Sequence, residues 1–197
     1  MIKIGINGFG RIGRLVLRAL LENYKDKIQV VAINDLGSIE ANAHLVKYDS
    51  THGTLPYDVE TSKSGFKILN QDIKVFAERD PANLPWGKVG VDVVLECTGL
   101  FLDKTSAEKH IKAGAKKVII SAPAKEVDFT VVQGVNSSEL KKEHNVISNG
   151  SCTTNCLAPV AMVLEKNFGI EYGYMTTIHS YTGDQKLLDT LHKDLRR

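Results

Sequence analysis

The sequence lacks the features of membrane proteins, nucleic-acid-binding proteins and secreted proteins. It contains no run of about 18 apolar residues, so we expect no part of it to span a bilayer. Its 25 Lys and Arg residues nearly balance 23 Asp and Glu residues, and the net charge of +2 provides no basic patch for a nucleic acid or an anionic membrane. The N-terminus has no basic segment, long apolar core or cleavage site, which argues against a secretory signal.

Cysteine is scarce as well. The three cysteines, Cys97, Cys152 and Cys156, are odd in number, which argues against a disulfide scaffold and favours a reducing compartment. We therefore predict a cytoplasmic protein. Hydrophobic residues make up 43% of the chain and charged residues 24%, a mixture typical of a globular protein, and no repeat or low-complexity stretch interrupts it.

Short apolar runs alternate with helical patterns along most of the chain. Because strands separated by helical crossovers form parallel sheets, this alternation predicts an α/β fold with a mostly parallel sheet covered on both faces. Between residues 57 and 69 the alternation breaks, and we expect an antiparallel excursion there. The expected strands are 2–7, 28–34, 57–61, 66–69, 74–77, 91–96, 117–121, 129–132 and 145–148, and the expected helices are 11–22, 40–47, 103–113 and 157–168.

A glycine-rich turn, GFGRIG at 8–13, follows the first predicted strand and precedes the first predicted helix. A GxGxxG pattern alone is a weak signal, but this context is typical of a dinucleotide-binding turn. Gly8 would permit the tight turn, Gly10 would let the backbone approach a diphosphate, and Gly13 would let the helix pack closely on the strand. The start of the helix would offer free N–H groups to the phosphates.

Asp35 ends the second predicted strand, 22 residues after Gly13. A carboxylate at this position can accept hydrogen bonds from both ribose hydroxyls of an adenosine and would repel a 2′-phosphate. This favours NAD over NADP as the cofactor. The alternative interpretation is that Asp35 only caps a turn.

Small and polar residues around Cys152 lead into the last predicted helix. Ser151 is placed to cap that helix, so Cys152 would lie in the first turn, where the helix dipole favours a thiolate. Lowering a thiol pKa by two units takes roughly 2.7 kcal/mol, whereas a helix terminus supplies ~1 kcal/mol, so a second partner is needed. His179, which ends a strand-like run at 172–178, is the candidate for that partner and for a general base; the alternative is a structural histidine.

Cys156 lies one helical turn after Cys152. A CxxxC spacing with no further cysteine nearby is a poor zinc signal. We therefore predict no metal site and a buried structural thiol at Cys156. The apolar spacing beyond Pro159 predicts that the helix continues past this proline.

Seven motifs together identify a family. They are NGFGRIG (7–13), ND (34–35), YDSTHG (48–53), ECTG (96–99), SAP (121–123), SCTTNC (151–156) and HSYT (179–182). With these motifs the chain resembles the phosphorylating glyceraldehyde-3-phosphate dehydrogenases over essentially all of its 197 residues. The motif around Cys152 is specific to that family and its nearest relatives.

The resemblance implies NAD-dependent oxidation and phosphorylation of glyceraldehyde 3-phosphate to 1,3-bisphosphoglycerate, a reaction of glycolysis. It implies that Cys152 attacks the aldehyde to give a hemithioacetal, that His179 acts as the base while hydride leaves for NAD, and that inorganic phosphate then releases the resulting thioester. It also implies a homotetramer. The implied cofactor-binding residues are Gly8, Gly10, Arg11, Ile12, Asp35, Arg79, Thr98 and Ser121, and the implied substrate-binding residues are Ser151, Cys152, Thr153, Thr182 and Arg197.

The resemblance further implies a doubly wound Rossmann nucleotide-binding domain at 1–151, followed at 152–197 by the incomplete start of an α+β catalytic domain. Family members are longer, so we expect the chain to stop within the loop after His179 and to be inactive by itself. Two positions depart from the family pattern. Gly150 replaces the usual Ala, and Thr-Leu at 190–191 replaces Leu-Pro, which leaves dual use of NAD and NADP open.

Three alternatives remain open. The first is the related enzyme that oxidises erythrose 4-phosphate, although SYT at 180–182 favours the triose phosphate. The second is a dinucleotide-binding fragment without activity. The third is a thiol hydrolase that uses Cys152 and His179, against which the glycine-rich turn argues.

Overall fold

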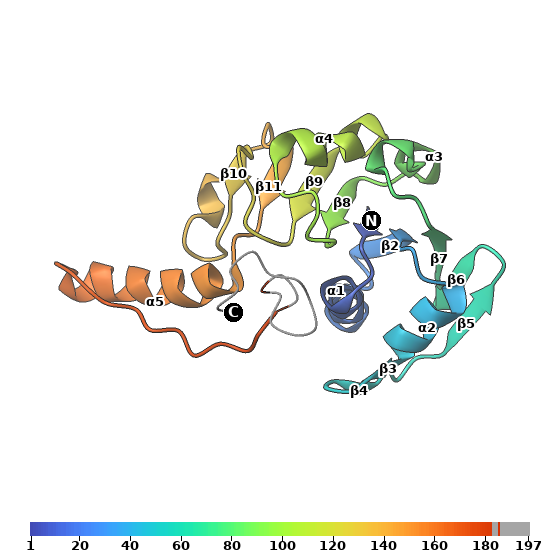
Figure 1. Cartoon of the computed structure of the whole chain (residues 1–197), viewed down its shortest axis with the longest axis horizontal. Helices are drawn as coiled ribbons and strands as arrows, with labels where there is room; N and C mark the ends of the chain where they lie inside the picture. The colour runs from blue at the N-terminus through green and yellow to red at the C-terminus, as the bar shows by residue number, and fades with distance from the viewer. Residues whose placement is uncertain (183–184, 186–197) are drawn as a thin grey trace, which may run out of the picture.

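The computed structural model describes residues 1–182 and 185, and within this part of the chain a nine-stranded sheet forms the centre of the molecule (Figure 1). Its strands lie in the order β10-β11-β9-β8-β1-β2-β7-β6-β5. They are β1 (Ile2–Asn7), β2 (Ile28–Asn34), β5 (Val59–Ser62), β6 (Gly65–Ile68), β7 (Gln71–Phe76), β8 (Val93–Glu96), β9 (Lys117–Ile120), β10 (Phe129–Thr130) and β11 (Val146–Ser148). A separate hairpin consists of β3 (Tyr48–Asp49) and β4 (Gly53–Thr54).

In the described part of the chain four α-helices lie between strands, and a fifth follows β11. They are α1 (Arg11–Asn23), α2 (Ile39–Lys47), α3 (Trp86–Val89), α4 (Lys104–Lys112) and α5 (Cys152–Phe168), with short 3₁₀ turns at Pro81–Asn83 and Ser137–Glu139. All strand pairs from β10 to β7 are parallel, whereas β6 pairs antiparallel with both β5 and β7. The mostly parallel α/β fold with an antiparallel excursion is therefore confirmed.

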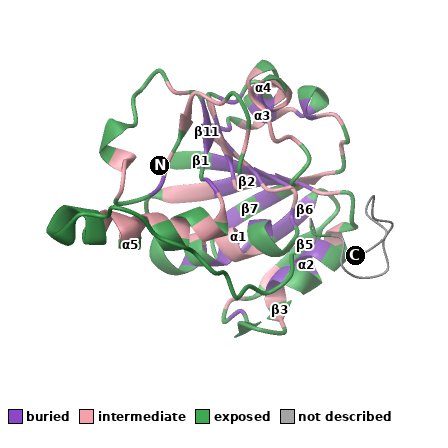
Figure 2. Cartoon of the chain, turned by 60° about the vertical axis from the view of Figure 1, so that its left-hand side comes forward, coloured by how far each residue is buried: buried purple, intermediate pink, exposed green. Residues whose placement is uncertain are grey.

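Helices cover both faces of the sheet, with α1 and α2 on one face and α3 and α4 on the other (Figure 1). On the first face Leu17 and Leu21 of α1 and Val46 of α2 pack into one hydrophobic core. On the second face Trp86 and Ala107 belong to another. Figure 2 shows the buried strands between these layers. The two cores explain why the strands have continuous apolar runs instead of an alternating pattern.

Asp128 links α4 to the strands β10 and β11 at one side of the sheet. Its carboxylate accepts hydrogen bonds from Lys104 Nζ at 2.6 Å and from the backbone N–H groups of Asn145 at 2.8 Å and Val146 at 2.9 Å. These donors, the Lys104 ammonium first, lower the pKa of Asp128 to about 2. The charged carboxylate therefore stabilises the packing of α4 on β10 and β11.

Helix α5 differs from the other helices because none of its residues is buried (Figure 2). It begins at Cys152, directly after the predicted cap Ser151, and it continues through Pro159 as predicted. The prediction of a buried Cys156 is wrong: its thiol is exposed, because α5 projects from the sheet instead of packing on it. No helix in the described part of the chain is long and apolar enough to cross a membrane.

One other local prediction is wrong. The segment around Pro81, for which we predicted no helix or strand, forms a 3₁₀ turn and α3. The predicted strands mostly end within one or two residues of the observed ones, but the strand expected at 172–178 does not form. In the described residues this segment pairs with no strand, and Tyr174 and Ile178 are fully exposed, at 99% and 101%. A strand-like composition without a hydrogen-bonding neighbour does not make a strand.

Candidate functional site

The carboxyl ends of the parallel strands carry the predicted site residues in one row. Because β11, β9, β8, β1 and β2 are neighbours in that order, the residues that follow them lie in the same order along one edge of the sheet. These residues are Cys152, Ser121, Thr98, Gly8 and Asp35. Four strand spacings of about 4.8 Å separate the two ends of the row by roughly 19 Å. In doubly wound folds a dinucleotide lies along this edge.

The three glycines of the turn between β1 and α1 have the geometry that the sequence predicted for them. Gly8 has φ of +88°, and a Cβ on it would lie 2.7 Å from the backbone nitrogen of Thr98. A Cβ on Gly13 would lie 2.3 Å from the carbonyl oxygen of Gly8, so the helix packs directly on the turn. Around Gly10 a Cβ would meet nothing within 4 Å, and no side chain caps α1 there. The first turn of α1 therefore presents free N–H groups on open space.

A cavity of about 410 Å³ lies against this turn, at the ends of β1, β2, β7 and β8. Five of the predicted cofactor-binding residues line it, namely Gly8, Gly10, Asp35, Arg79 and Thr98. The structure therefore brings together the glycine-rich turn, a carboxylate and a guanidinium, the groups that diphosphate and ribose recognition requires.

The remaining predicted cofactor residues lie around the cavity without lining it. The Arg11 guanidinium forms an ion pair with Asp49 of the β3–β4 hairpin, at 2.6 Å between Nη1 and Oδ2. Ile12 is half exposed on α1. Ser121 hydrogen-bonds to the thiol of Cys97, which does line the cavity. Burial raises the pKa of the Cys97 thiol to about 11, so this cysteine is unreactive at neutral pH.

Asp35 has a structural role in addition to the predicted contact with ribose. Its Oδ2 accepts a hydrogen bond from the backbone N–H of Phe9, and its Oδ1 accepts one from the N–H of Gly37, both at 2.9 Å. The carboxylate thus ties the end of β2 to the glycine-rich turn. Each oxygen keeps a further lone pair for a ligand hydroxyl, so the two interpretations of Asp35 are compatible.

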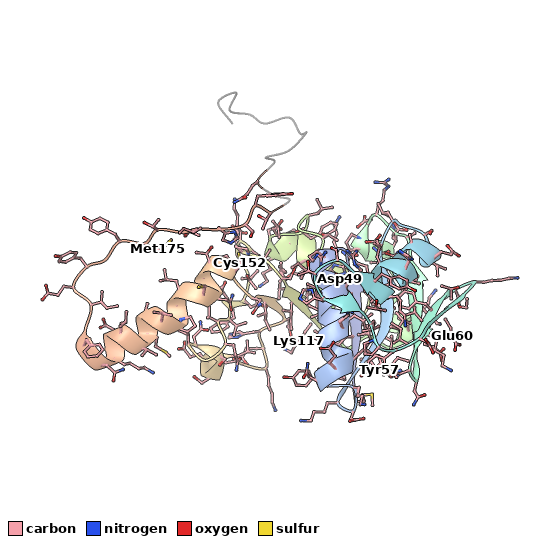
Figure 3. The ribbon with its side chains drawn as sticks, turned by 90° about the horizontal axis from the view of Figure 1, so that it is seen from below. Asp49, Tyr57, Glu60, Lys117, Cys152 and Met175 are labelled. Atoms are coloured by element: carbon pink, nitrogen blue, oxygen red, sulfur yellow. The ribbon has the colours of Figure 1, made fainter. Side chains whose placement is uncertain are left out.

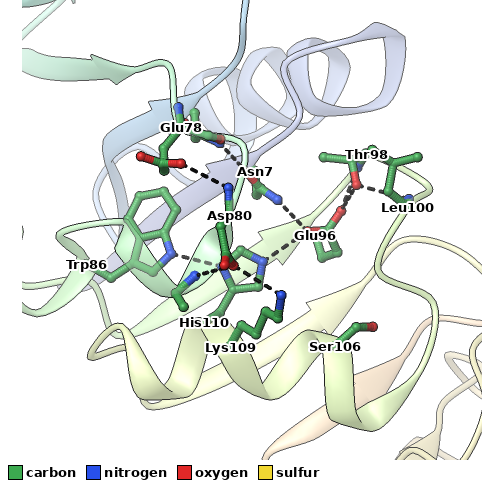
Figure 4. Close-up of polar contacts among 12 residues, drawn as sticks. Asn7, Glu78, Asp80, Trp86, Glu96, Thr98, Leu100, Ser106, Lys109 and His110 are labelled. Atoms are coloured by element: carbon green, nitrogen blue, oxygen red, sulfur yellow. Dashed lines mark hydrogen bonds and ion pairs between the residues drawn. The ribbon is translucent and has the colours of Figure 1, made fainter.

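A network of polar side chains, most of them buried, adjoins this cavity, and we call it the Glu96 network (Figure 4). Asn34 donates to Asn7 at 2.7 Å, Asn7 donates to Glu96 at 2.6 Å, and Trp86 Nε1 donates to His110, whose other ring nitrogen lies 3.0 Å from Glu96. The backbone N–H and hydroxyl of Thr98 also donate to Glu96. The network consists of Asn7, Asn34, Trp86, Glu96, Thr98 and His110. Sequence reasoning gave no role to Glu96, Asn34, Trp86 or His110, although a Glu that ends a buried strand and Asn residues that end two others are unusual enough to mark the site.

The second half of the site is the start of α5. Ser151 caps the helix as predicted, with its Oγ accepting from the N–H of Thr154 at 2.9 Å, and this places Cys152 in the first turn. After α5 the chain returns alongside the helix through Met175, toward Cys152 (Figure 3). It brings His179 Nε2 to 3.2 Å from Cys152 Sγ. The structure therefore joins the two residues that the sequence could only suggest as partners.

The contacts of His179 define the chemistry of this pair. Its Nδ1 hydrogen-bonds to the carbonyl oxygen of Ser180, which can only accept, so Nδ1 carries the proton. Nε2 then carries no proton and can accept the thiol proton of Cys152. Once Nε2 has taken that proton it donates a hydrogen bond to the thiolate, and this contact, assisted by the N–H of Thr153, lowers the pKa of the Cys152 thiol below its usual value. The arrangement can generate an exposed, nucleophilic thiolate next to a general base.

Asn155 is a further residue of this half that sequence reasoning missed. Its side-chain amide donates to the carbonyl of Asn149 at 2.7 Å and to that of Ser151 at 2.9 Å. Both carbonyls belong to the loop between β11 and α5, where Gly150 has φ of +67°. Asn155 therefore holds the loop that delivers Cys152.

Of the other predicted substrate-binding residues, Ser151, Thr153 and Thr182 lie within the described part of the chain. The Ser151 hydroxyl is 2.7 Å from that of Thr154, and Thr153 follows Cys152 in the first turn of α5. The N–H of Thr182 donates to Gln185. Arg197 and the positions 190–191 lie outside the described residues. Within residues 1–182 and 185, no cluster of three His, Cys, Asp or Glu side chains could hold a metal ion.

Two family models match the sequence. The one described as the NAD binding domain of glyceraldehyde 3-phosphate dehydrogenase matches residues 2–104, and the one described as its C-terminal domain matches residues 151–197. Curated relatives named glyceraldehyde-3-phosphate dehydrogenase are 57% identical in Xanthobacter flavus over 196 residues, 57% in Pseudomonas aeruginosa over 197 and 58% in Geobacillus stearothermophilus over 197. Each match covers 100% of this chain, and the chain spans 58, 59 and 58% of the length of these relatives.

Proposed function

The chain belongs to the glyceraldehyde 3-phosphate dehydrogenase family, and from this premise we propose that the protein catalyses the NAD-dependent oxidation and phosphorylation of glyceraldehyde 3-phosphate to 1,3-bisphosphoglycerate. The observation that carries the proposal is the Cys152–His179 pair, 3.2 Å apart, on the same sheet edge as the glycine-rich turn. Because the chain spans 58–59% of the length of its relatives, the activity is proposed for the whole protein.

The residues around the cavity fit NAD. The open space at Gly10 and the free N–H groups of α1 suit a diphosphate, and the carboxylate of Asp35 at the end of β2 suits the adenosine ribose. A 2′-phosphate next to Asp35 would be repelled, which favours NAD over NADP. At the far end of the row, a nicotinamide would lie near Cys152. NAD supplies the hydride acceptor there, and the remaining chemistry belongs to the chain.

In the proposed mechanism Cys152 Sγ, as the thiolate, attacks the aldehyde carbon. The C=O bond becomes a C–O bond, and the oxygen takes up the proton that His179 Nε2 received from the thiol, which gives a hemithioacetal and returns Nε2 to its unprotonated state. His179 Nε2 then accepts that hydroxyl proton while the hydride leaves the same carbon, so the carbonyl re-forms as a thioester on Cys152. Inorganic phosphate attacks the thioester carbon, the C–S bond breaks, and the acyl phosphate leaves with Cys152 restored as the thiolate. Ser151 and Thr153 lie where they can donate hydroxyl hydrogen bonds to phosphate groups.

The test is an assay of NADH formation by the whole protein, with glyceraldehyde 3-phosphate and with or without inorganic phosphate. We expect sustained turnover that requires phosphate and that is lost in Cys152→Ser. The matched control is Cys156→Ser, which removes an exposed thiol one helical turn away and should keep full turnover. NADH formation that persists in Cys152→Ser, or that does not depend on phosphate, would contradict the proposal.

Two further proposals concern the whole protein. The scarcity of cysteine supports a cytoplasmic location, and the family resemblance supports a homotetramer. The oligomeric state is tested by sedimentation of the purified protein, for which a monomer at micromolar concentration is the contradicting result.

A further inference from the structure

The proposed mechanism does not use the Glu96 network, although the network lies directly under the proposed cofactor site. Glu96 and His110 are both fully enclosed, at 1% and 0% exposure. We propose that Glu96 is a positioning residue for nucleotide binding: it holds the turn after β8 against the glycine-rich turn after β1, at the separation that admits a diphosphate. This inference rests on the proposed binding of NAD and goes beyond it by assigning a role to a residue that does not line the cavity.

The direction of every hydrogen bond on one side of Glu96 is fixed by the backbone. Asn34 donates from Nδ2 to the carbonyl of Glu78, and its Oδ1 accepts from the N–H of Glu78, both at 2.8 Å. The amide of Asn34 therefore cannot flip. Its Nδ2 also donates to Asn7 Oδ1, so Asn7 in turn must present its own Nδ2 to Glu96.

The direction is equally fixed on the other side. An indole N–H can only donate, so the hydrogen bond from Trp86 leaves His110 Nδ1 without a proton. His110 is then the neutral tautomer with a proton on Nε2, which donates to Glu96 Oε2. The backbone N–H of Thr98 is a donor as well, and it donates to Glu96 Oε1 at 2.7 Å. Each carboxylate oxygen thus receives two hydrogen bonds, and three of the four come from donors that cannot reverse.

This network reaches the nucleotide site through three of its members, because Asn7, Asn34 and Thr98 line the cavity. Thr98 Oγ1 donates to Glu96 and accepts from the N–H of Leu100. The Thr98 hydroxyl proton is therefore committed to Glu96, and Thr98 acts through its position. A Cβ on Gly8 would lie 2.7 Å from Thr98 N, so the two turns are in direct contact. A shift of Thr98 after loss of the carboxylate would move the glycine-rich turn.

The isosteric variant Glu96→Gln tests the inference in the full chain. An amide nitrogen in place of Oε2 meets two donors, Asn7 and His110, that cannot rearrange to accept. In place of Oε1 it meets the backbone N–H of Thr98, which can only donate, and the Thr98 hydroxyl alone can turn to accept. We expect the dissociation constant for NAD, measured by calorimetry well below the unfolding temperature, to rise about tenfold or more. We also expect amide hydrogen exchange at Gly8, Phe9 and Gly10 to accelerate about tenfold, a readout that needs no ligand.

A matched control separates positioning from a general loss of stability. Asp128→Asn also removes a carboxylate, one that accepts hydrogen bonds from a cation and two backbone N–H groups. It lies at the side of the sheet formed by β10 and β11, away from the glycine-rich turn. It should lower the unfolding temperature while leaving NAD affinity and exchange at the glycine-rich turn unchanged. If Glu96→Gln does not fold, His110→Phe removes one of the four donors and should weaken NAD binding about threefold.

Each outcome decides a separate question. Glu96→Gln with lowered stability but NAD affinity within twofold of wild type and unchanged exchange at 8–10 overturns the positioning role. If Glu96→Gln fails to fold, the positioning role is overturned by a His110→Phe variant that has lowered stability but unchanged NAD affinity and unchanged exchange at 8–10. A wild-type chain that binds no NAD refutes the proposed function, whereas the exchange measurement still tests whether Glu96 holds the turn.

Discussion

The contact between Gly13 and Gly8 makes one substitution unusually informative. Replacement of a helical glycine by alanine normally stabilises a helix by about 1 kcal/mol. In Gly13→Ala, however, the new Cβ would lie 2.3 Å from the carbonyl oxygen of Gly8 and 3.1 Å from Ile6 Cγ2. Ordinary contacts begin at 3.4 Å, so the backbone contact is too short by 1.1 Å. The closer obstacle is a main-chain carbonyl, which cannot turn aside as a side chain can, so α1 must move away from β1.

The expected cost follows from that displacement. Overpacking that shifts backbone costs about 1–3 kcal/mol, which outweighs the gain in helix propensity. For a chain of this size we expect the unfolding temperature to fall by roughly 2–10 °C. The movement of α1 also withdraws its N–H groups from the cavity, so NAD affinity should fall together with stability.

The matched control is Gly10→Ala, in the same glycine-rich turn. Gly10 has φ of −74°, and a Cβ there meets nothing within 4 Å. We expect its free energy of unfolding to stay within about 0.5 kcal/mol of wild type. Because the added methyl group faces the proposed diphosphate site, NAD affinity alone should fall.

The assays are thermal or urea unfolding of both variants and calorimetric titration with NAD. The reasoning is refuted if Gly13→Ala is as stable as wild type or more stable. It is also refuted if Gly10→Ala binds NAD as tightly as wild type, since the open space at Gly10 would then not be the diphosphate site.

Three further predictions concern the thiol and the charged contacts. His179→Asn should raise the pKa of the Cys152 thiol. Alkylation of Cys152 by iodoacetamide at pH 7 should then slow about tenfold for each unit by which that pKa rises, with little difference at pH 10. Equal alkylation rates of the variant and the wild type at pH 7 would argue against the Cys152–His179 pair. Asp128→Asn should lower the free energy of unfolding by about 1–2 kcal/mol near neutral pH. Because the pKa of Asp128 is lowered to about 2, this contribution is complete above its unfolded pKa of about 3.9 and disappears as the pH falls through 2, so urea unfolding of the two proteins should converge in that window. Asn155→Ala should slow alkylation of Cys152 severalfold, whereas Asn167→Ala, which removes a single hydrogen bond at the other end of α5, should not.

The sequence predicted the parts of this molecule that depend on local patterns. The strand–turn–helix around Gly8 could be predicted because each glycine has a separate steric reason, and the cap at Ser151 could be predicted because capping involves neighbouring residues. The row of site residues followed once the strands were assigned to a parallel sheet.

Contacts between distant segments could not be predicted in the same way. The spacing of Cys152 and His179 in the sequence left their pairing open. The chain brings them together by returning beside α5, and the segment 172–178 does so without forming the strand that its composition suggested. The role of Glu96 depends on donors from three different segments, and the periodicity of a sequence does not predict that they meet at one side chain. The exposure of Cys156 depends on α5 projecting from the sheet, which the apolar spacing of the helix argued against.

The central claim is that an aldehyde is oxidised while bound covalently to Cys152. The most direct test incubates the whole protein with NAD and glyceraldehyde 3-phosphate in the absence of inorganic phosphate, and then locates the acyl group by mass spectrometry of the peptides. The account predicts a burst of NADH stoichiometric with the protein, with an acyl group on the Cys152 peptide that disappears when phosphate is added. A burst of NADH with the acyl group on another residue, or with no acyl group that phosphate removes, would contradict it.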